Sequence, residues 1–481
     1  MKKFILYISI LSGLSLSSCE SYLDTVPDNR TEINTPEKIS ELLVSAYPSA
    51  NYSPFCEIMS DNVGDNVQTS SPPIYSKPYF WEDILLDDND TPQYYWAACY
   101  SAIASANQAL EAIKALGDTK KLAPQKGEAL VARAYAHFML VNLFAKFYDP
   151  ATASTDAGIP YVTETEKVVI KQYDRKTVAY VYDMIEKDLN EGLPLISDQA
   201  YKIPAYHFTK AAANAFASRF YLYKQNYDKV ILHASNVAGT GGFASNMRNW
   251  NTDYSTKSFT EISFIYSQAS EKANLLLAET GSYWGRYWAA NRYMLPSDLG
   301  QQLYFGANPS GGFWAYSLFG SERGIYLPKY NEHFVRVSAN ANIGNGYNMI
   351  PLFTTEEVLF NRAEANTLKG NYDAAITDLN TFLSLRIDSY SPSLHNLTVA
   401  KNNAFYGTSN TRAAMLTTIL NFKRLEFMHE GLRWFDILRY KIPVTHSNQD
   451  GSSQTLSAND LRRVLQIPQE ASLSGVAANP R

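Results

Sequence analysis

Apolar residues recur at three- and four-residue spacing along two long segments in the first third of the chain, a pattern typical of helices with one buried face. The first segment begins at Pro92 and ends at Gly117, and the second begins at Pro124 and ends at Asp149 and Pro150. Proline is favoured in the first turn of a helix, whereas glycine or proline often follows its last turn. Two helices joined by so short a connection predict a helical hairpin.

A helix–turn–helix pattern occurs twice further along the chain. Residues 218–238 and 361–383 align, and each copy reads as a helix, a K-x-N-Y-D turn and a second helix. Tetratricopeptide repeats have this arrangement, because each helix pair buries its apolar face on the next pair. The two copies are not consecutive, so the pattern also predicts a large insertion between them.

The insertion, residues 239–353, is rich in Gly, Asn, Ser, Tyr and Trp and shows little helical periodicity. We therefore predict a mostly all-α fold, with a tetratricopeptide-like helical scaffold that carries a loop-rich, aromatic-rich insertion; loops of this kind often carry recognition. Residues 39–481 are expected to form one domain, with helical parts at 39–238 and 354–481 on either side of the insertion. Residues 52–90 also read as loop, because they are rich in Pro, Ser and Asp.

The N-terminus has the features of an export signal. Lys2 and Lys3 precede an apolar run of about fifteen residues, shorter than the roughly twenty of a membrane span, and the run ends in "LSSC" at Cys19. A branched residue and two small residues before a cysteine are typical of a bacterial lipobox. We expect residues 1–18 to be a lipoprotein signal peptide, Cys19 to carry the lipid and residues 19–38 to be a tether. The alternative is an ordinary signal peptide with a chance cysteine.

Composition, charge and motifs limit which partners, cofactors and metal sites we expect. The net charge is −5 and the chain has no long Lys/Arg run, which argues against a nucleic-acid partner. Two alternatives remain for Cys56 and Cys99, a disulfide or two buried thiols. The sequence has no metal-spaced His or Cys cluster and no Walker, G-x-S-x-G or H-E-x-x-H motif, so no cofactor or metal is expected. The run Asp87 to Asp90 lacks the Gly and Glu of an EF-hand and is expected to be a solvated loop or a helix cap.

Several blocks together resemble the SusD/RagB family of outer-membrane nutrient-binding lipoproteins, from Cys19 almost to Arg481. The blocks are "LSSC", "YYWAACYSAIASANQALEAI", "GEALVARAYAHFMLVNLFAKFYD", "YKQNYDKVI", "MLPSDLGQQLYF", "FNRAEANTLKGNYDAAITDLN" and "FKRLEFMHEGLRWFDILRYK". The C-terminus departs from the family's usual ending.

The resemblance implies a tetratricopeptide-type scaffold anchored on the outer leaflet of the outer membrane. It also implies a partner, a SusC-like TonB-dependent transporter barrel, over which the lipoprotein sits as a lid. Members of the family bind oligosaccharides or, in a minority, peptides, and do no chemistry on them. The expected ligand is therefore an oligosaccharide or polysaccharide, and a peptide is the nearest alternative.

Aromatic residues among small polar residues are the candidates for ligand binding. A sugar ring presents an apolar C–H face to flat aromatic side chains and a rim of hydroxyls to polar ones. The stretch "GSYWGRYWAANRY" carries five aromatic rings and two arginines. The predicted ligand-binding residues are Tyr283, Trp284, Arg286, Tyr287 and Trp288; Trp314 on a loop exposed by Gly311 and Gly312; and Tyr75, Tyr79 and Trp81 with Asp61, Asn62, Asp65 and Asn66 as hydroxyl partners.

The alternative for these rings is that they pack the insertion onto the scaffold, since large aromatics are mostly buried. We expect at least two of Trp81, Trp284, Trp288 and Trp314 to contact ligand. Trp96 and Trp434 lie in periodic helical segments and are expected in the core.

One segment, "KRLEFMHEGLRWFDILR", also suggests a surface glycoside hydrolase, because Glu426 and Glu430 are four residues apart and share a helix face. Arg424 and Arg433 lie beside them, and a paired glutamate stays ionised, the wrong state for a general acid. We therefore expect a structural ion-pair network here and no enzyme activity.

Overall fold

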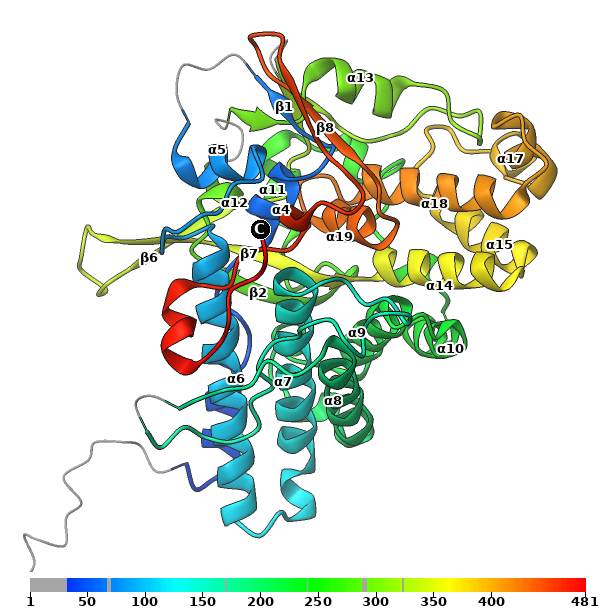
Figure 1. Cartoon of the computed structure of the whole chain (residues 1–481). Coiled ribbons are helices and arrows are strands. Elements are labelled where there is room, and N and C mark those ends of the chain that lie inside the picture. The colour runs from blue at the N-terminus through cyan, green and yellow to red at the C-terminus, as the bar shows by residue number, and fades with distance from the viewer. Residues whose placement is uncertain (1–32, 67–70, 169–170, 240, 288–291, 322–323) are drawn as a thin grey trace, which may run out of the picture.

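The computed structural model describes residues 33–66, 71–168, 171–239, 241–287, 292–321 and 324–481 (Figure 1). Helices dominate, and the strands are few and short. The helices α6 (Pro92–Ala115), α7 (Ala123–Phe144) and α8 (Val178–Gly192) stand side by side in the lower part of the view, and the short strands gather with further helices and loops in the upper part (Figure 1). The predicted division into a helical scaffold and a loop-rich region is therefore confirmed.

The predicted hairpin consists of α6 (Pro92–Ala115) and α7 (Ala123–Phe144). The Thr91 hydroxyl caps α6 by accepting the N–H of Tyr94. Helix α7 is buried along most of its length, because α6 and α8 (Val178–Gly192) pack on opposite sides of it. A Cβ at Gly127 would lie 2.7 Å from the carbonyl oxygen of Gly192, so the contact between α7 and α8 requires glycine.

The two repeat copies form the helix pairs α9 (Lys210–Tyr223) with α10 (Tyr227–Ala238) and α14 (Thr355–Lys369) with α15 (Tyr372–Leu383). Helix α10 packs on α14, so the copies stack directly although the insertion separates them in sequence. Their turns also match, because Gln225 and Gly370 occupy the same repeat position and both have positive φ, 62° and 84°. The tetratricopeptide-like arrangement is thus confirmed.

The insertion contains a sheet that periodicity did not predict. Strand β7 (Gly344–Thr354) lies between β2 (Asn274–Thr280) and β6 (Glu332–Arg336), and both pairs are antiparallel. The other elements of this region are α11 (Phe259–Tyr266), α12 (Tyr283–Tyr287), α13 (Ser297–Phe305), β3 (Tyr293–Met294), β4 (Phe319–Ser321) and β5 (Gly324–Tyr326). The hairpin of β6 and β7 projects from the body of the molecule (Figure 1).

The chain has further helices and strands before and after these elements. The N-terminal ones are α3 (Pro36–Leu43), α4 (Ser53–Ile58), α5 (Pro73–Tyr79), β1 (Gly64–Asp65) and η4 (Pro204–Tyr206); the C-terminal ones are α16 (Pro392–His395), α17 (Val399–Phe405), α18 (Thr411–Glu426), α19 (Leu432–Arg439), β8 (Val444–Ser447), β9 (Ser453–Leu456) and η9 (Gln469–Ser474). Residues 52–90, expected as loop, therefore hold two short helices.

The buried residues test two further predictions, one about two tryptophans and one about two cysteines. Trp96 and Trp434 are buried, as predicted. Cys56 and Cys99 are both buried free thiols, which excludes the disulfide alternative between them. Burial raises the pKa of both thiols, so they remain protonated and unreactive at neutral pH. Among the described residues, no helix combines the length and the apolar character needed to cross a membrane.

Candidate ligand-binding site

The early loop and the inserted segment that we expected to share a site lie next to each other. Strand β1 pairs with β3, with Asp65 opposite Tyr293. The guanidinium of Arg292 binds the Asp65 carboxylate, with 2.7 Å between Nη2 and Oδ2. Tyr79 stacks on Tyr293 with 4.3 Å between ring centroids. These contacts join segments that are more than two hundred residues apart in the sequence.

Helix α12 is fixed by contacts on its two sides. The buried Asp90 carboxylate accepts the backbone N–H of Trp284 at 2.8 Å and the hydroxyl of Tyr75 at 3.3 Å. Burial raises the pKa of Asp90 to about 6, and these hydrogen bonds limit the rise. On the other side, a Cβ at Gly285 would lie 1.6 Å from the amide nitrogen of Asn348, so glycine lets α12 approach β7. Asp87 and Asp88 are exposed, as expected for a solvated loop, but Asp90 at the end of that run is buried and does not cap α6.

Five side chains form a surface on and around this anchored helix, and we call them the α12 surface: Tyr75, Tyr283, Arg286, Glu332 and Phe334. Tyr283 is 38% exposed, and the guanidinium of Arg286 lies 4.8 Å from the centre of its ring. Glu332 on β6 pairs with Arg286 at 3.3 Å. Phe334, two residues further along β6, lies on the same face and is 53% exposed.

Gly346 makes room for the charged pair of this surface. It lies opposite Phe334 in the β6–β7 register, and a Cβ there would lie 1.9 Å from the Arg286 guanidinium and 2.8 Å from the Glu332 carboxylate. The surface therefore combines aromatic rings with one cation and one anion that pair with each other. Sequence reasoning missed Phe334 and Glu332, because "EHFVR" has no regular alternation of apolar and polar residues and so gives no strand signal.

Three predicted tryptophans are buried in packing contacts, which was the alternative given above. The indole N–H of Trp81 donates to the Met59 carbonyl at 3.0 Å, and its ring stacks on His446. Trp284 is only 1% exposed and donates to the carbonyl of His429 at 3.3 Å. The expectation that Trp314 lies on an exposed loop is wrong, because its indole is buried against residues such as Phe422, Phe382 and Tyr316.

Several of the other predicted ligand-binding residues are also engaged in contacts within the protein. Tyr79, Asn62 and Asn66 are buried, and Asn62 donates to the Glu57 carboxylate at 3.0 Å. The Asp61 carboxylate pairs with Arg433 at 2.9 Å, so its hydrogen-bonding capacity is used inside the protein. Trp288 and the side chain of Tyr287 lie outside the described residues. Of the predicted set, Tyr75, Tyr283 and Arg286 are the ones that lie at the α12 surface.

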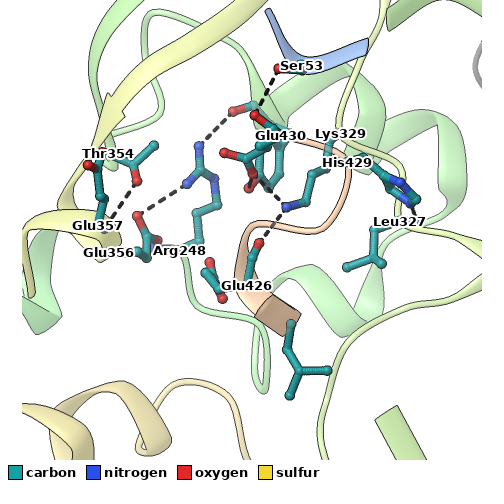
Figure 2. Close-up of polar contacts among 12 residues, drawn as sticks. Ser53, Arg248, Leu327, Lys329, Thr354, Glu356, Glu357, Glu426, His429 and Glu430 are labelled. Carbon is teal, nitrogen blue, oxygen red and sulfur yellow. Dashed lines mark hydrogen bonds and ion pairs between the residues drawn. The ribbon is translucent and has the colours of Figure 1, made fainter. Parts of the chain in front are cut away.

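The carboxylates of Glu426 and Glu430 belong to a buried charge network (Figure 2). Arg386 binds Glu426 through two hydrogen bonds of 2.8 Å, and Lys329 binds Glu430 at 2.6 Å. Burial alone would raise the pKa of Glu426, but the charge and hydrogen bonds of Arg386, together with the charge of Lys329 and a hydrogen bond from Tyr316, outweigh burial and lower that pKa. An ionised glutamate with both oxygens engaged is suited to holding the fold together and not to general acid catalysis.

The expected ion-pair network is present, but its partners differ from those predicted. Arg433 pairs with Asp61, and Arg424 donates to the Asn62 side chain at 2.8 Å. The cations that neutralise the two glutamates, Arg386 and Lys329, come from distant segments of the chain. Within the part of the chain that the structure describes, no group of three or more His, Cys, Asp or Glu residues could hold a metal ion.

Comparisons with known proteins identify the family to which the chain belongs. A family model described as "SusD family" matches residues 221–472, and a second, described as "Starch-binding associating with outer membrane", matches residues 21–222. The first covers more than half of the chain, and the chain belongs to the SusD family.

Individual relatives agree with this assignment. The SusD-like protein P38 of Formosa agariphila is 22% identical, and the match covers 91% of this chain and 92% of that protein. A SusD superfamily protein from Bacteroides thetaiotaomicron shares 20% identity with a TM-score of 0.69, and the match covers 93% of this chain and 100% of the other. A structure described as a laminarin-binding SusD-like protein shares 18% identity with a TM-score of 0.62, covering 92% and 99%. At these identities the solved structures support the fold alone.

Proposed function

We propose that the protein captures an oligosaccharide at the cell surface and delivers it to a SusC-like TonB-dependent transporter in the outer membrane, to which Cys19 anchors it by lipid. Membership of a carbohydrate-binding family supports the ligand class, and a relative of this fold is described as binding laminarin. The observation that carries the proposal for this chain is the α12 surface, where two partly exposed rings flank a paired Arg286 and Glu332.

Each part of the α12 surface has a separate role in binding. The rings of Tyr283 and Phe334 pack on the C–H faces of sugar rings. The guanidinium of Arg286 donates to ring and hydroxyl oxygens, and the Glu332 carboxylate accepts from hydroxyls. Because Arg286 and Glu332 hold each other, little side-chain entropy is lost when a ligand binds. Capture involves no covalent step.

Calorimetric titration of residues 20–481 tests the ligand and its site. The panel contains plant, fungal and host oligosaccharides together with a peptide digest. One glycan is expected to bind saturably, and Tyr283→Ala or Arg286→Gln is expected to weaken binding at least tenfold, equivalent to about 1.4 kcal/mol. Tyr180→Ala is the matched control, because Tyr180 is similarly exposed but lies on α8, away from the α12 surface.

A peptide ligand is the second candidate, and one observation favours it. Strand β6 is an edge strand of its sheet, and within the described residues no further strand pairs with it. An extended peptide can bind such an edge through its backbone. Binding of the peptide digest with no response to any glycan would replace the carbohydrate proposal with this one.

The hydrolase alternative is tested by an assay for newly released reducing ends. We expect none from any glycan that binds, because Glu426 and Glu430 are buried and paired. Release of reducing ends that is lost in Glu426→Gln would contradict the proposal.

The anchor and the partner are tested in cells. A Cys19→Ser variant is expected to lose labelling by a palmitate analogue and to leave the outer-membrane fraction. Affinity purification of the wild-type protein in mild detergent is expected to recover a TonB-dependent barrel identified by mass spectrometry. Lipid labelling that persists in Cys19→Ser would contradict the predicted anchor.

A further inference from the structure

A cavity of about 860 Å³ lies on the other face of the sheet from the α12 surface. Successive residues of a strand point to opposite faces. Glu332 and Phe334 face α12, whereas His333, between them on β6, lines the cavity together with Asn331. The opposite walls come from the end of α3, from α6 and from the segment around η4. The cavity is therefore separate from the site proposed above.

Exposed apolar side chains converge on this cavity from three distant parts of the chain. They are Val44 next to α3, Ile203 before η4 and Phe264 on α11, and Phe264 is 54% exposed. Single exposed apolar residues are common on protein surfaces, but several around one hollow of this size mark a binding site. Ligand sites typically have volumes of about 300–1,000 Å³, and this cavity falls within that range.

Polar groups of both signs line the same cavity. Glu279 on β2 and His333 on β6 pair at 2.8 Å across the sheet. The side chains of Lys202, Gln268 and Asn331 also line it, and none of the three makes a hydrogen bond or ion pair to the described residues. One cation and one paired carboxylate leave no strong net charge, so the lining favours a neutral ligand with many donors and acceptors.

Buried hydrogen bonds connect the residues at the floor of the cavity. The buried carboxylate of Glu128 accepts the hydroxyl of Tyr47 at 2.6 Å and pairs with a ring nitrogen of His207 at 2.7 Å. The Tyr47 hydroxyl in turn accepts the backbone N–H of Phe208 at 2.8 Å. Because Tyr47 and His207 line the cavity, these bonds hold its shape before any ligand arrives.

We propose that this cavity is a second carbohydrate-binding site, which takes a neutral oligosaccharide segment. Phe264 provides the flat apolar surface for a sugar ring, and Gln268, Asn331 and Lys202 bind its hydroxyls. The choice of ligand class rests on the proposed function, whereas the location of the site does not. Two sites on opposite faces of one sheet would let a single chain hold two stretches of a polysaccharide.

Equilibrium titration tests the second site with five probes: laminarihexaose, cellohexaose, maltohexaose, xylohexaose and mannohexaose. For a probe that binds, the wild-type chain is expected to take up two molecules. Phe264→Ala combined with Gln268→Ala is expected to leave one, and Tyr283→Ala combined with Arg286→Gln is expected to leave the other. Phe405→Ala is the matched control, since Phe405 is exposed on α17 and does not line the cavity.

A filling variant separates loss of binding from loss of folding. Ser101 is exposed on α6 and lines the cavity, so Ser101→Trp is expected to block the second site while the thermal midpoint stays within a few degrees. One molecule per chain, lost with the Tyr283 and Arg286 variants and unaffected by Ser101→Trp, would overturn the second site but leave the proposed function intact. Absence of binding by every probe would overturn both proposals.

Discussion

Buried charged residues hold the loop-rich region to the helices of the C-terminal half. Arg386 reaches Glu426 and Glu356 at once, and Glu356 also binds Arg248 at 3.3 Å. Figure 2 shows Arg248 directed at Glu356 and Lys329 directed at Glu430. A buried ion pair gains little over an apolar pair of the same shape, but removal of one partner leaves an uncompensated buried charge.

We therefore predict that Arg386→Met lowers the free energy of unfolding by about 3–5 kcal/mol. The loss arises because Glu426 and Glu356 keep their burial but lose their shared cation. Urea denaturation measures the change. Arg462→Met is the control, because the Arg462 side chain is 41% exposed in its pair with Asp460 and its loss should cost less than about 1 kcal/mol. Equal effects of the two variants would show that burial does not control the energy of these pairs.

A second single residue, Glu57, makes the stability of the fold depend on pH. Burial raises the pKa of Glu57 from 4.5 to about 7, although the N–H groups of His429 and Gly431 and the Asn62 amide favour its ionised form. The folded protein holds this proton more tightly than the unfolded chain. The stability gained from the proton is fully present below about pH 4.5 and is lost as the pH rises through about 7.

We predict that the wild-type free energy of unfolding contains a component from Glu57 that falls by about 3 kcal/mol between pH 4.5 and 7.5. In Glu57→Gln that component should be absent, whatever the absolute stability of the variant. Glu261→Gln serves as the control, since Glu261 is exposed and its lowered pKa places its own effect below this window. Identical pH profiles for wild type and Glu57→Gln would rule out the raised pKa.

The candidate site also shows that the sequence could not reveal which of its aromatic rings are buried. The stretch from Gly281 to Tyr293 looked exposed because its neighbours are small and polar, and Tyr283 does lie at the surface. Trp284, the next residue, is buried because the carbonyl of His429 and the carboxylate of Asp90 meet it from far away in the chain. Local composition cannot distinguish these two outcomes, since the burial of a ring depends on segments that approach it only in the fold.

At the scale of elements, long periodic segments were predictable and short strands were not. Helices α6 and α7 match the predicted hairpin because each presents apolar residues over many turns. Strand β2 was missed because "NLLLAET" has no regular alternation of apolar and polar residues, and five of its seven residues are buried. Strand β7 begins among glycine and asparagine residues, which resemble a loop until a partner strand is known.

The helix contact between α7 and α8 gives a prediction at this scale. Gly127→Ala places a methyl group 2.7 Å from the Gly192 carbonyl oxygen and should lower the free energy of unfolding by about 1–3 kcal/mol, because two packed helices must separate. Thermal and urea unfolding measure the change. For comparison, Gly281→Ala meets its nearest atom, on Asn89, at 3.4 Å and should change stability by less than about 0.5 kcal/mol. Tolerance of Gly127→Ala would mean that the helices can shift without cost.

At the scale of the whole molecule, the order of the sequence blocks was sufficient to predict the fold class, whereas the contacts between distant blocks became visible only in the structure. Most of the buried hydrophobic residues, from Ile39 to Val476, form one connected cluster. The stacked repeat copies contribute to it on one side, and Trp250 and Trp314 contribute from the insertion. The insertion therefore shares its core with the scaffold.

A shared core predicts that the chain from residue 39 onward unfolds as one unit. Far-UV circular dichroism reports mainly on the scaffold helices, while tryptophan fluorescence reports strongly on the insertion, which holds four of the seven tryptophans. We expect the two probes to give the same urea midpoint, although chains of this length often unfold in steps. Trp250→Ala, which opens a cavity in the insertion's part of the core, should lower both midpoints together. If the fluorescence midpoint alone moved, the insertion would be a separate folding unit and the single-domain prediction would be wrong.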